Sequence, residues 1–519
     1  MQNNTSRTVL TARNIGMNVA SRGVVSLLKL VTRIIFVHYL SENLLGVNGL
    51  FADVLGMLAL AELGVGSAIQ YALYRPLAEK NEAKIRSLML FYRKAYRVIS
   101  GIVLALGLLL LPFLPLLVKE HASIPYFYGI YGLFLFNLAF EYFFSFRRVL
   151  AQASQNAYVL VPFTTAFQGL TALLQIGAVV LFSEKEYCYL IYVAVQSVVL
   201  IAEDITVNRY LEHRYPLLHH LNAAEKLPET EKTHIFRQVK ALLLHKIGGY
   251  AVGRTDTLII SILIDLVVVG HFTNYSTLIV TVAGVAYLFV EHTTASFGNL
   301  FATSEPEKCR AVFEEMLVFD YFLYGVGSVF FITLFSPFIE LAYGAKFLLP
   351  MPTVVLLVLA DYYSIGMIQV FAAAKSAAGL YKPDRFVPLV QAALNLGVSI
   401  LLGHFIGLPG IFIGTLVSSI PPFIVKPYLL YKRVFHTSPA PFFRRFALET
   451  LYIAFFGVVS YLIPAFLWQP ENPVLRLIYR FAVTLIVSVG SFWLLHRKDE
   501  STQKLLRRVA NLLRRRTRK

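Results

Sequence analysis

The sequence contains few charged residues, and acidic residues are the scarcer kind. Asp, Glu, Lys and Arg make up 15% of its 519 residues, against about 25% in typical soluble domains. Asp and Glu number 30, whereas Lys and Arg number 47. The mean hydropathy is +0.64, and 57% of the residues are hydrophobic. This composition excludes an ordinary soluble protein and indicates a chain that crosses a membrane many times.

Motifs for several enzyme and pump classes are also absent. The sequence has no G-x-x-x-x-G-K-[ST] phosphate loop, no Asp-x-Asp pair and no H-E-x-x-H zinc motif. Its only cysteines, Cys188 and Cys309, are predicted to lie on opposite sides of the membrane, which excludes a disulfide between them. We therefore expect no catalytic residue, metal site, cofactor or nucleic-acid partner, and an ATP-driven pump is disfavoured.

Apolar runs long enough to cross a bilayer as helices, for which about 20 residues are needed, occur along the whole chain. They are too long and too uniformly apolar for the strands of an outer-membrane barrel. The fourteen predicted spans are Asn18–Tyr39, Val47–Tyr71, Val98–Val118, Tyr126–Phe146, Val159–Phe182, Tyr187–Val207, Ala241–Ile264, Phe272–Phe297, Met316–Leu341, Met351–Ala374, Phe386–Ile406, Gly410–Leu430, Phe446–Leu467 and Val474–Leu495.

The Lys and Arg residues set the predicted orientation, because the cytoplasmic loops of membrane proteins are enriched in them. Most of the 47 fall in loops and termini on the same side as the N-terminus. Those predicted on the outer side are Lys119, Lys185, Lys346, Arg476 and Arg480. We therefore predict a multi-pass protein of the cytoplasmic membrane with both termini in the cytoplasm.

A long hydrophilic stretch divides the first twelve spans into two sets of six. Residues 1–208 are predicted to form a first lobe, 209–238 a cytoplasmic linker and 239–436 a second lobe. Residues 437–519 add helices 13 and 14 and a basic cytoplasmic tail. The predicted fold class is therefore an all-α membrane protein of about 14 helices, with two six-helix lobes and an added C-terminal pair.

The two lobes are predicted to be copies of one another. IIFVHYLSENLLGVNGLF, from Ile34, aligns with LIISILIDLVVVGHFTNY, from Leu258, at an offset of 224 residues that places Gly46 on Gly270. At an offset of 226, VPFTTAFQGL resembles VPLVQAALNL. Because both copies begin on the inner side, they form a parallel repeat related by a pseudo-twofold axis along the membrane normal. Chance similarity between apolar helices is the alternative.

The first predicted span carries three basic residues and no acid. Arg22, Lys29 and Arg33 are spaced seven and four residues apart. On a helix they fall within about 40° of one another, along a stripe roughly 16 Å long. Each charge costs about 2.5–3.5 kcal/mol at the centre of a lipid-facing helix. We therefore expect the stripe to line a hydrated cavity that binds an anion such as a phosphate group.

The second half repeats part of this basic pattern. Arg22 aligns with Lys246, and Arg254 lies one residue beyond the position aligned with Lys29, so both are predicted to reach the same cavity between the lobes. The acids of the predicted spans are either structural ion-pair partners or sites for a coupling ion. The candidates for ion coupling are Asp53, Glu62, Asp256 and Glu291; further acids are Glu141, Glu203, Asp204 and Asp361.

Two segments make the chain resemble a known family. LSENLLGVNGLFADVLGMLALAELGVGSAIQYALYRPLAEKNEAKI, from Leu40, and GRTDTLIISILIDLVVVGHFTNY, from Gly253, resemble the polysaccharide flippases of the multidrug/oligosaccharidyl-lipid/polysaccharide exporter superfamily. The resemblance implies alternating access by two lobes, which carries an undecaprenyl-pyrophosphate-linked oligosaccharide outward for cell-surface polysaccharide synthesis. The implied partners are this lipid-linked substrate, the membrane lipids and a polysaccharide polymerase.

Three other functions are alternatives. A lipid II flippase of the same superfamily also has fourteen helices and a basic cavity, but TRIIFVHYL stands here where that branch has an Arg-Asp pair. A cation-coupled multidrug exporter would favour an acidic cavity. A polysaccharide polymerase or ligase would need a sizeable outer loop for its chemistry, whereas the predicted outer loops are all short. We therefore expect a transporter rather than an enzyme.

Overall fold

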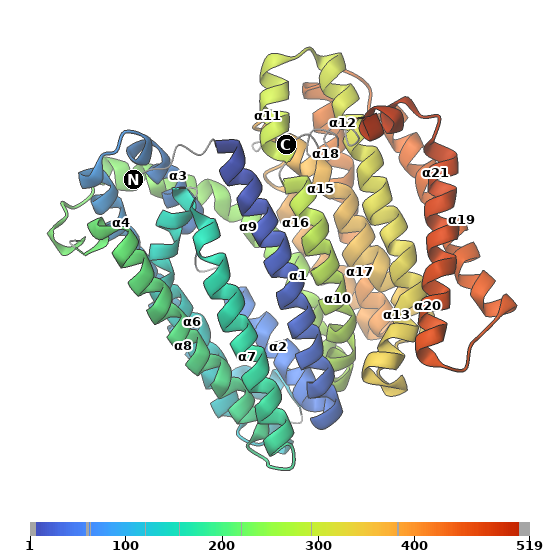
Figure 1. Ribbon diagram of the computed structural model, residues 1–519, viewed down its shortest axis with the longest axis horizontal. Coiled ribbons are helices and arrows are strands. Elements are labelled where there is room, and N and C mark those ends of the chain that lie inside the picture. The colour runs from blue at the N-terminus through green and yellow to red at the C-terminus, as the bar shows by residue number, and fades with distance from the viewer. Residues whose placement is uncertain are drawn as a thin grey trace. The chain divides into compact units, whose positions relative to one another are not determined.

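The computed structural model is built of helices, and the part of the chain that it describes contains no strand (Figure 1). That part comprises residues 7–507 except 59–61, 63, 120, 155, 220, 292 and 381–382. It also leaves out the side chains of residues 7–20, 22, 67, 238, 240–254, 288, 291, 295 and 299. Eleven of its helical segments are long and apolar enough to cross a membrane. The predicted all-α membrane fold is thereby confirmed.

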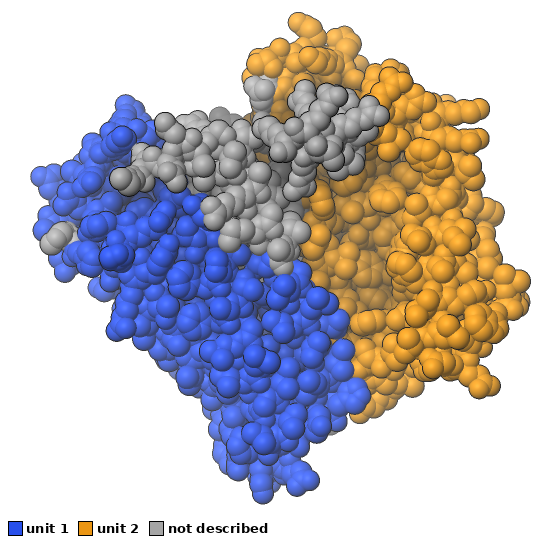
Figure 2. Space-filling view, viewed as in Figure 1, with its two compact units in different colours: residues 1–270 blue, residues 271–519 orange. Residues whose placement is uncertain are grey.

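The first compact unit, Met1–Gly270, is blue in Figure 2. Its helices are α1 (Arg7–Tyr39), α2 (Glu42–Leu58), α3 (Val65–Ala78), α4 (Glu82–Leu110), α5 (Leu114–Leu117), α6 (Phe127–Ala153), α7 (Val161–Phe182), α8 (Cys188–Arg214) and α9 (Glu229–Leu263). Short 3-10 turns are η2 (Leu111–Phe113), η3 (His121–Ser123), η4 (Ala157–Val159), η5 (Pro216–Leu218) and η6 (Leu221–Ala223). Helix α10 (Leu266–Glu291) begins in this unit.

The second compact unit, His271–Lys519, is orange in Figure 2. Its helices are α11 (Thr293–Thr303), α12 (Pro306–Asp320), α13 (Gly327–Tyr343), α14 (Met351–Val358), α15 (Ile365–Ala377), α16 (Val387–Ile406), α17 (Leu408–Ser418), α18 (Ile420–Arg433), α19 (Ala440–Leu467), α20 (Pro473–Thr484) and α21 (Gly490–His496), with a 3-10 turn η8 (Ala345–Phe347). Three π-helical segments join helices into continuous spans: η7 (Tyr321–Val326), η9 (Leu359–Ser364) and η10 (Leu485–Val489).

The fourteen predicted spans correspond in order to these helices. Eleven coincide with the apolar segments, and the others are α1, α9, and α2 with α3. Helices α1 and α9 carry basic residues, whereas the predicted span Val47–Tyr71 is divided between α2 and α3. The division lies at Gly64, whose φ of 81° is a left-handed conformation that glycine adopts without a steric penalty.

The observed units and the predicted lobes divide the chain at different places. Helix α9, which was expected to open the second lobe after a linker at 209–238, packs against α2, α3 and α5 of the first unit. The compact units separate after Gly270. The assignment of residues 239–436 to a second lobe therefore rests on the repeat and stays a prediction.

Helix boundaries follow the predicted repeat. Helix α1 ends at Tyr39 and α2 begins at Glu42; α9 ends and α10 begins 224 residues later in each case. The starts of α7 and α16 differ by the second offset, 226 residues. Each of these two helices has proline as its second residue, where the missing N–H removes no helical hydrogen bond. The end of α1 and the starts of α2 and α7 thus fall at positions equivalent to the end of α9 and the starts of α10 and α16.

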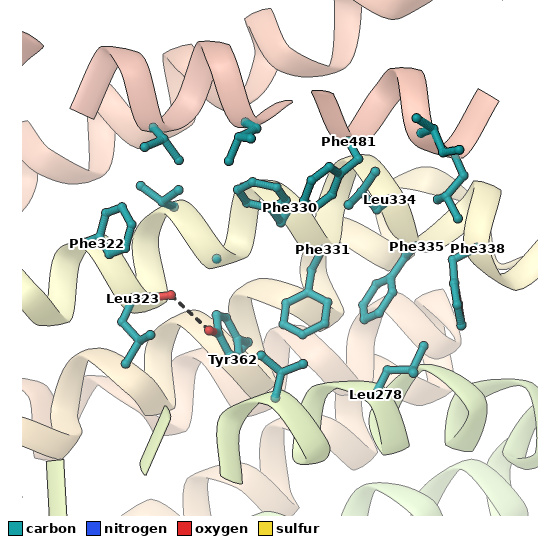
Figure 3. Close-up of a pocket in the computed structure, with 17 residues that line it drawn as sticks. Leu278, Phe322, Leu323, Phe330, Phe331, Leu334, Phe335, Phe338, Tyr362 and Phe481 are labelled. Atoms are coloured by element: carbon teal, nitrogen blue, oxygen red, sulfur yellow. Dashed lines mark hydrogen bonds between the residues drawn. The ribbon is translucent and has the colours of Figure 1, made fainter. Parts of the chain in front are cut away.

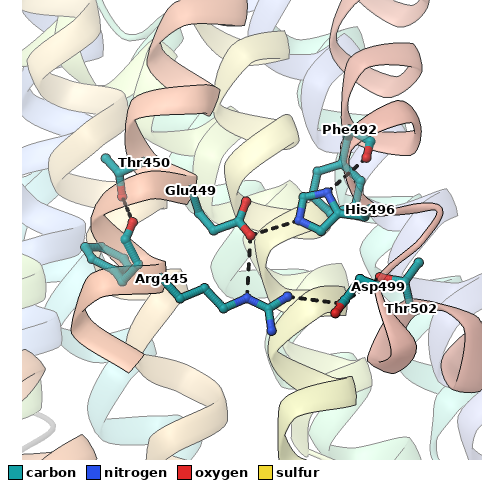
Figure 4. Close-up of polar contacts among 8 residues, drawn as sticks. Arg445, Glu449, Thr450, Phe492, His496, Asp499 and Thr502 are labelled. Carbon is teal, nitrogen blue, oxygen red and sulfur yellow. Dashed lines mark hydrogen bonds and ion pairs between the residues drawn. The ribbon is translucent and has the colours of Figure 1, made fainter. Parts of the chain in front are cut away.

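The last two predicted spans, α19 and α20 with α21, are joined by a buried ionic network (Figure 4). In it, Glu449 Oε1 lies 2.9 Å from His496 Nε2 and 3.6 Å from Arg445 Nε. Both spans pack on α13, where the Thr484 hydroxyl donates a 3.0 Å hydrogen bond to Thr333. The added helix pair is thereby fixed to the second unit by polar contacts at buried positions.

Candidate functional site

Helix α1 packs on α7 along one face and exposes an apolar second face. On the packing face, the hydroxyl oxygens of Ser21 and Thr165 are 2.5 Å apart, and Leu28 lies near Gly169. On the second face, the exposed side chains are Val24, Leu27 and Val31. A face of this composition suits the hydrocarbon of a bilayer, in which apolar side chains are as well solvated as in a protein core.

The basic residues of α1 lie on a third face. Lys29 follows Leu28 by one residue, so it is turned about 100° from the packing face and about 140–160° from the exposed apolar side chains. Lys29 is exposed and forms no ion pair with any side chain that the structure describes. Arg33, one turn further, is half-buried and interacts electrostatically with Tyr192 of α8. This basic face therefore avoids both α7 and the apolar face.

Four predicted site residues have side chains outside the described part of the structure. They are Arg22 on α1, Lys246 and Arg254 on α9, and Glu291 at the end of α10. The helices that carry them are described, and α9 is continuous through both of its basic positions. The roles of these four residues in anion binding or ion coupling stay predictions.

Two of the predicted coupling acids lie on helices that pack together, α2 and α9. The Oδ2 atom of Asp53 on α2 accepts a 2.6 Å hydrogen bond from the hydroxyl of Thr257 on α9. Asp256 precedes Thr257 and is only 5% exposed. Both acids also have other interactions. The fold thus brings together two acids that are far apart in the sequence, and their binding of a coupling ion stays a prediction.

Glu62, the third described coupling candidate, is held at the break between α2 and α3. Its Oε1 atom accepts hydrogen bonds from the Tyr96 hydroxyl at 2.7 Å and from the Gly66 backbone N–H at 3.1 Å. The Tyr92 ring packs edge-on against Tyr96, with the ring centroids 4.3 Å apart. Free N–H groups at a helix start stabilise a carboxylate. Glu62 therefore fastens the start of α3 to α4.

Other membrane acids form the ion pairs that were the alternative interpretation. Arg148 of α6 lies 2.7 Å from Asp204 and 3.2 Å from Glu203, both on α8. The neighbouring Arg147 pairs with Glu212 at 2.5 Å. Buried charges are normally paired in this way, because an unpaired charge costs far more to bury. For these acids the structure supports a role in holding α6 to α8.

The second unit contains an apolar cavity of about 700 Å³ that the sequence did not indicate (Figure 3). Side chains from α10, η7, α13, η9, α20 and η10 line it, among them Leu278, Phe322, Phe330, Leu334, Phe338 and Phe481. The polar lining residue is Tyr362, whose hydroxyl donates a 3.0 Å hydrogen bond to the Leu323 carbonyl and so presents only its ring to the cavity. The volume is in the range of small-molecule binding sites.

No protein-family model and no curated protein matches the chain, but solved structures do. The lipid II flippase MurJ, in an inward closed conformation, matches with a TM-score of 0.67 and 12% identity over 92% of this chain and 98% of the flippase. An inward-facing MATE multidrug-resistance transporter of the MOP superfamily matches with a TM-score of 0.54 and 15% identity, over 79% of this chain and 97% of that transporter. A MATE transporter of Vibrio cholerae matches with a TM-score of 0.53 and 14% identity, over 83% of this chain and 99% of that transporter. The chain has the fold of these transporters.

The matched structures belong to flippases and multidrug transporters of the superfamily that the sequence resembles. At 12–15% identity they show the fold, not the substrate. The narrower resemblance to polysaccharide flippases therefore stays a prediction. The basic face of α1 and the apolar cavity are features of this chain itself, and the proposal of function rests on them.

Proposed function

We propose that the chain moves an undecaprenyl-pyrophosphate-linked oligosaccharide from the inner to the outer leaflet of the cytoplasmic membrane, by alternating access, for cell-surface polysaccharide synthesis. The basic face of α1 carries the proposal, because its charges lie in the first predicted membrane span, apart from both the packing face and the apolar face. The fold shared with a lipid II flippase supports it. The expected partners are the lipid-linked substrate, membrane lipids and a polysaccharide polymerase.

Lys29 and Arg33 suit the pyrophosphate group of such a substrate. A charge facing lipid at the helix centre costs about 2.5–3.5 kcal/mol, so the basic face needs water or an anion beside it. Phosphate oxygens accept charge-assisted hydrogen bonds from Lys and Arg, each contributing about 1.5–3 kcal/mol. Arg22, Lys246 and Arg254 are proposed to extend the same basic surface. The head group is then held in a hydrated cavity while the isoprenoid tail stays in hydrocarbon.

Transfer of a labelled polyprenyl-pyrophosphate oligosaccharide between the leaflets of proteoliposomes tests this function. The wild-type protein should accelerate transfer over protein-free vesicles. Transfer of lipid II alone would assign the chain to lipid II flippases, whose fold it shares. Efflux of a cationic drug without transfer of the oligosaccharide would favour a multidrug exporter, like the MATE transporter that has this fold. Lengthening of the oligosaccharide would instead reveal a polymerase.

The apolar cavity is proposed to hold part of the isoprenoid tail, and Leu334→Trp tests this by filling it. Because the tail only exchanges one hydrocarbon environment for another, we expect a modest effect of about 1 kcal/mol, or roughly fivefold slower transfer. The effect should appear with the full-length polyprenyl chain and vanish with a short-chain analogue. Leu451→Trp, at an exposed position of α19, is the control. Equal slowing of both substrates would remove the tail from this cavity.

The proposed orientation can be measured with engineered cysteines. The native thiols of Cys188 and Cys309 are only 1% and 2% exposed, so they should react slowly from either side. Lys185→Cys, in the exposed turn between α7 and α8, should react with an impermeant reagent applied to intact cells. Glu225→Cys, in the exposed segment before α9, should react only after permeabilisation. Labelling of Glu225→Cys in intact cells would reverse the orientation.

A further inference from the structure

Asp320, in the second unit, is a buried acid that the proposed function does not yet use. It is the last residue of α12, directly before the π-helical segment η7, and is 1% exposed. Among the residues that the structure describes, neither oxygen of its carboxyl group has a hydrogen-bond partner and no basic side chain pairs with it. Asp320 therefore differs from Asp53, Glu62, Glu203 and Asp204, which all have hydrogen-bond or ion-pair partners.

Three buried carboxylates of this chain show how an ionised acid is accommodated. Asp204 pairs with Arg148, and Asp384 pairs with Lys375. Glu449 contacts both His496 and Arg445 (Figure 4). A buried carboxylate without such partners carries a desolvation cost that is comparable with the whole net stability of many proteins. A neutral carboxyl group avoids most of that cost, so the Asp320 side chain must carry a proton or bind a cation.

The surroundings of Asp320 favour the proton. Among the described residues, no group of three or more His, Cys, Asp or Glu side chains is arranged to hold a metal ion. The groups close enough to interact with its charge are the phenols of Tyr324 on η7 and of Tyr362 and Tyr363 on η9. These side chains offer neutral oxygens and no negative charge to balance a bound cation.

Among the described side chains, Tyr363 interacts with both Asp320 and Glu449 of α19. Glu449 and Arg445 of α19 interact with Tyr321, the residue after Asp320, and Tyr287 of α10 interacts with Tyr324. Helix α11 has no titratable residue, and α15 has only Lys375, which pairs with Asp384. Among the described residues, the acid thus has tyrosine side chains nearby and no basic partner.

Two π-helical segments meet beside this carboxyl group. Segment η7 follows Asp320, η9 carries Tyr362, and the Tyr362 hydroxyl is bonded to the Leu323 carbonyl of η7. Such segments are rare, and they are frequently found at functional sites. Tyr362 also lines the apolar cavity (Figure 3). One side chain thus adjoins both the cavity and Asp320, so a movement of η7 against η9 would hydrate the acid and reshape the cavity together.

We propose that Asp320 is a proton-binding site: its carboxyl group carries a proton in the conformation described here and releases it to water when η7 and η9 separate. The bond that breaks is the carboxyl O–H, and the proton passes to a water molecule. The site would couple transfer of the lipid-linked oligosaccharide to a proton gradient, and this coupling role rests on the proposed function. The presence of the proton itself does not depend on which substrate is carried.

Infrared spectroscopy of the full-length protein in lipid nanodiscs tests the proton directly. At neutral pH, the wild-type protein should show a carbonyl stretch of a protonated carboxyl group that is lost in Asp320→Asn. The band should persist in Glu449→Gln, which changes another buried acid, one that has basic partners. Asparagine matches a protonated aspartate in size and charge, so Asp320→Asn should fold. Identical carboxyl bands in the wild type and Asp320→Asn would overturn the proposal.

Transport measurements test the coupling separately. In proteoliposomes, an imposed pH gradient should accelerate transfer by the wild type, whereas Asp320→Asn should transfer equally fast with and without the gradient. A wild-type response to the gradient in Asp320→Asn would overturn the coupling role of the site. If the wild type transfers no lipid-linked oligosaccharide, the proposed function fails, and the infrared result still decides whether Asp320 holds a proton.

Discussion

Lys29→Glu is expected to abolish transfer of the lipid-linked oligosaccharide, whereas Lys29→Ala should only slow it. Alanine removes one charge-assisted hydrogen bond to the pyrophosphate, worth about 1.5–3 kcal/mol, which corresponds to roughly 10–150-fold weaker binding. Glutamate also places a negative charge beside the phosphates. Two like charges 4 Å apart repel by about 4 kcal/mol near a protein surface, close to a further thousandfold. Initial rates of transfer in proteoliposomes measure both effects.

The control for this prediction is Lys185→Glu, which introduces the same charge change at an exposed turn outside the membrane. It should leave transfer unchanged. Membrane insertion of the Lys29 variants should be normal, because a lysine within a membrane span hinders insertion rather than aiding it. Equal rates for Lys29→Ala and Lys29→Glu would contradict a phosphate contact, since only a bound anion makes the reversal worse than the neutralisation.

Lys246 extends the same argument to the second half. Combining Arg22→Glu with Lys246→Glu should not restore transfer, because the partner of both groups is the substrate. The rival interpretation pairs Lys246 with an acid of α2 or the segment after it. Glu62 already accepts two hydrogen bonds, and Asp53 accepts one from Thr257. Recovery of transfer in Lys246→Glu with Asp53→Lys would nevertheless make Lys246 a structural ion-pair partner and remove it from the substrate site.

Hydropathy predicted the positions of the helices well, but it did not predict how side chains are arranged in the interior of the protein. The spans and the ends of repeated helices follow from apolar run length and from the alignment of the two halves, so both were accessible from the sequence. The cavity could not be predicted from the sequence. A residue such as Phe330 or Leu334 adds the same hydropathy whether it faces lipid, protein or an empty space. The π-helical segments were also invisible, since one extra residue in a turn leaves the composition of a span unchanged.

The acids show a second limit of sequence reasoning. Asp53 and Asp256 both lie in predicted spans, but only the packing of α2 on α9 shows that Asp53 is hydrogen-bonded to Thr257, the residue next to Asp256. Asp320 also lies in a predicted span, yet it was not selected. What distinguishes it is that neither of its oxygens has a partner in the described part of the chain, a property that depends on every neighbouring helix. Burial and pairing are tertiary properties, so no local pattern could have identified it.

Gly46, by contrast, was singled out by the repeat, and the structure explains why the residue must be glycine. A Cβ atom on Gly46 would lie 2.2 Å from the carbonyl oxygen of Leu266, at the start of α10. A Cβ atom on its repeat partner, Gly270, would lie 3.0 Å from the Glu42 carbonyl oxygen and 3.3 Å from the Gly46 nitrogen. The two equivalent glycines therefore face each other where α2 and α10 begin, as expected for positions close to a pseudo-twofold axis.

Gly46→Ala is consequently expected to be among the most destabilising single substitutions in this chain. The obstructing atom belongs to a backbone carbonyl, so the two helices must separate, and overpacking of this kind costs about 1–3 kcal/mol or more. Gly270→Ala should destabilise the protein less, because the neighbouring atoms need to move by only a few tenths of an ångström. Thermal unfolding of the purified variants in detergent measures the order, with the melting temperature lowest for Gly46→Ala.

Gly132→Ala provides the matched control for these glycine variants. Gly132 lies within α6, and an added Cβ atom would meet nothing within 4 Å. Alanine favours a helix over glycine by up to about 1 kcal/mol, so this variant should unfold at the wild-type temperature or slightly above it. A melting temperature for Gly46→Ala equal to that of Gly132→Ala would mean that α2 and α10 are not in close contact at Gly46. The agreement between the repeat and the packing of its glycines would then be a coincidence of two apolar helices.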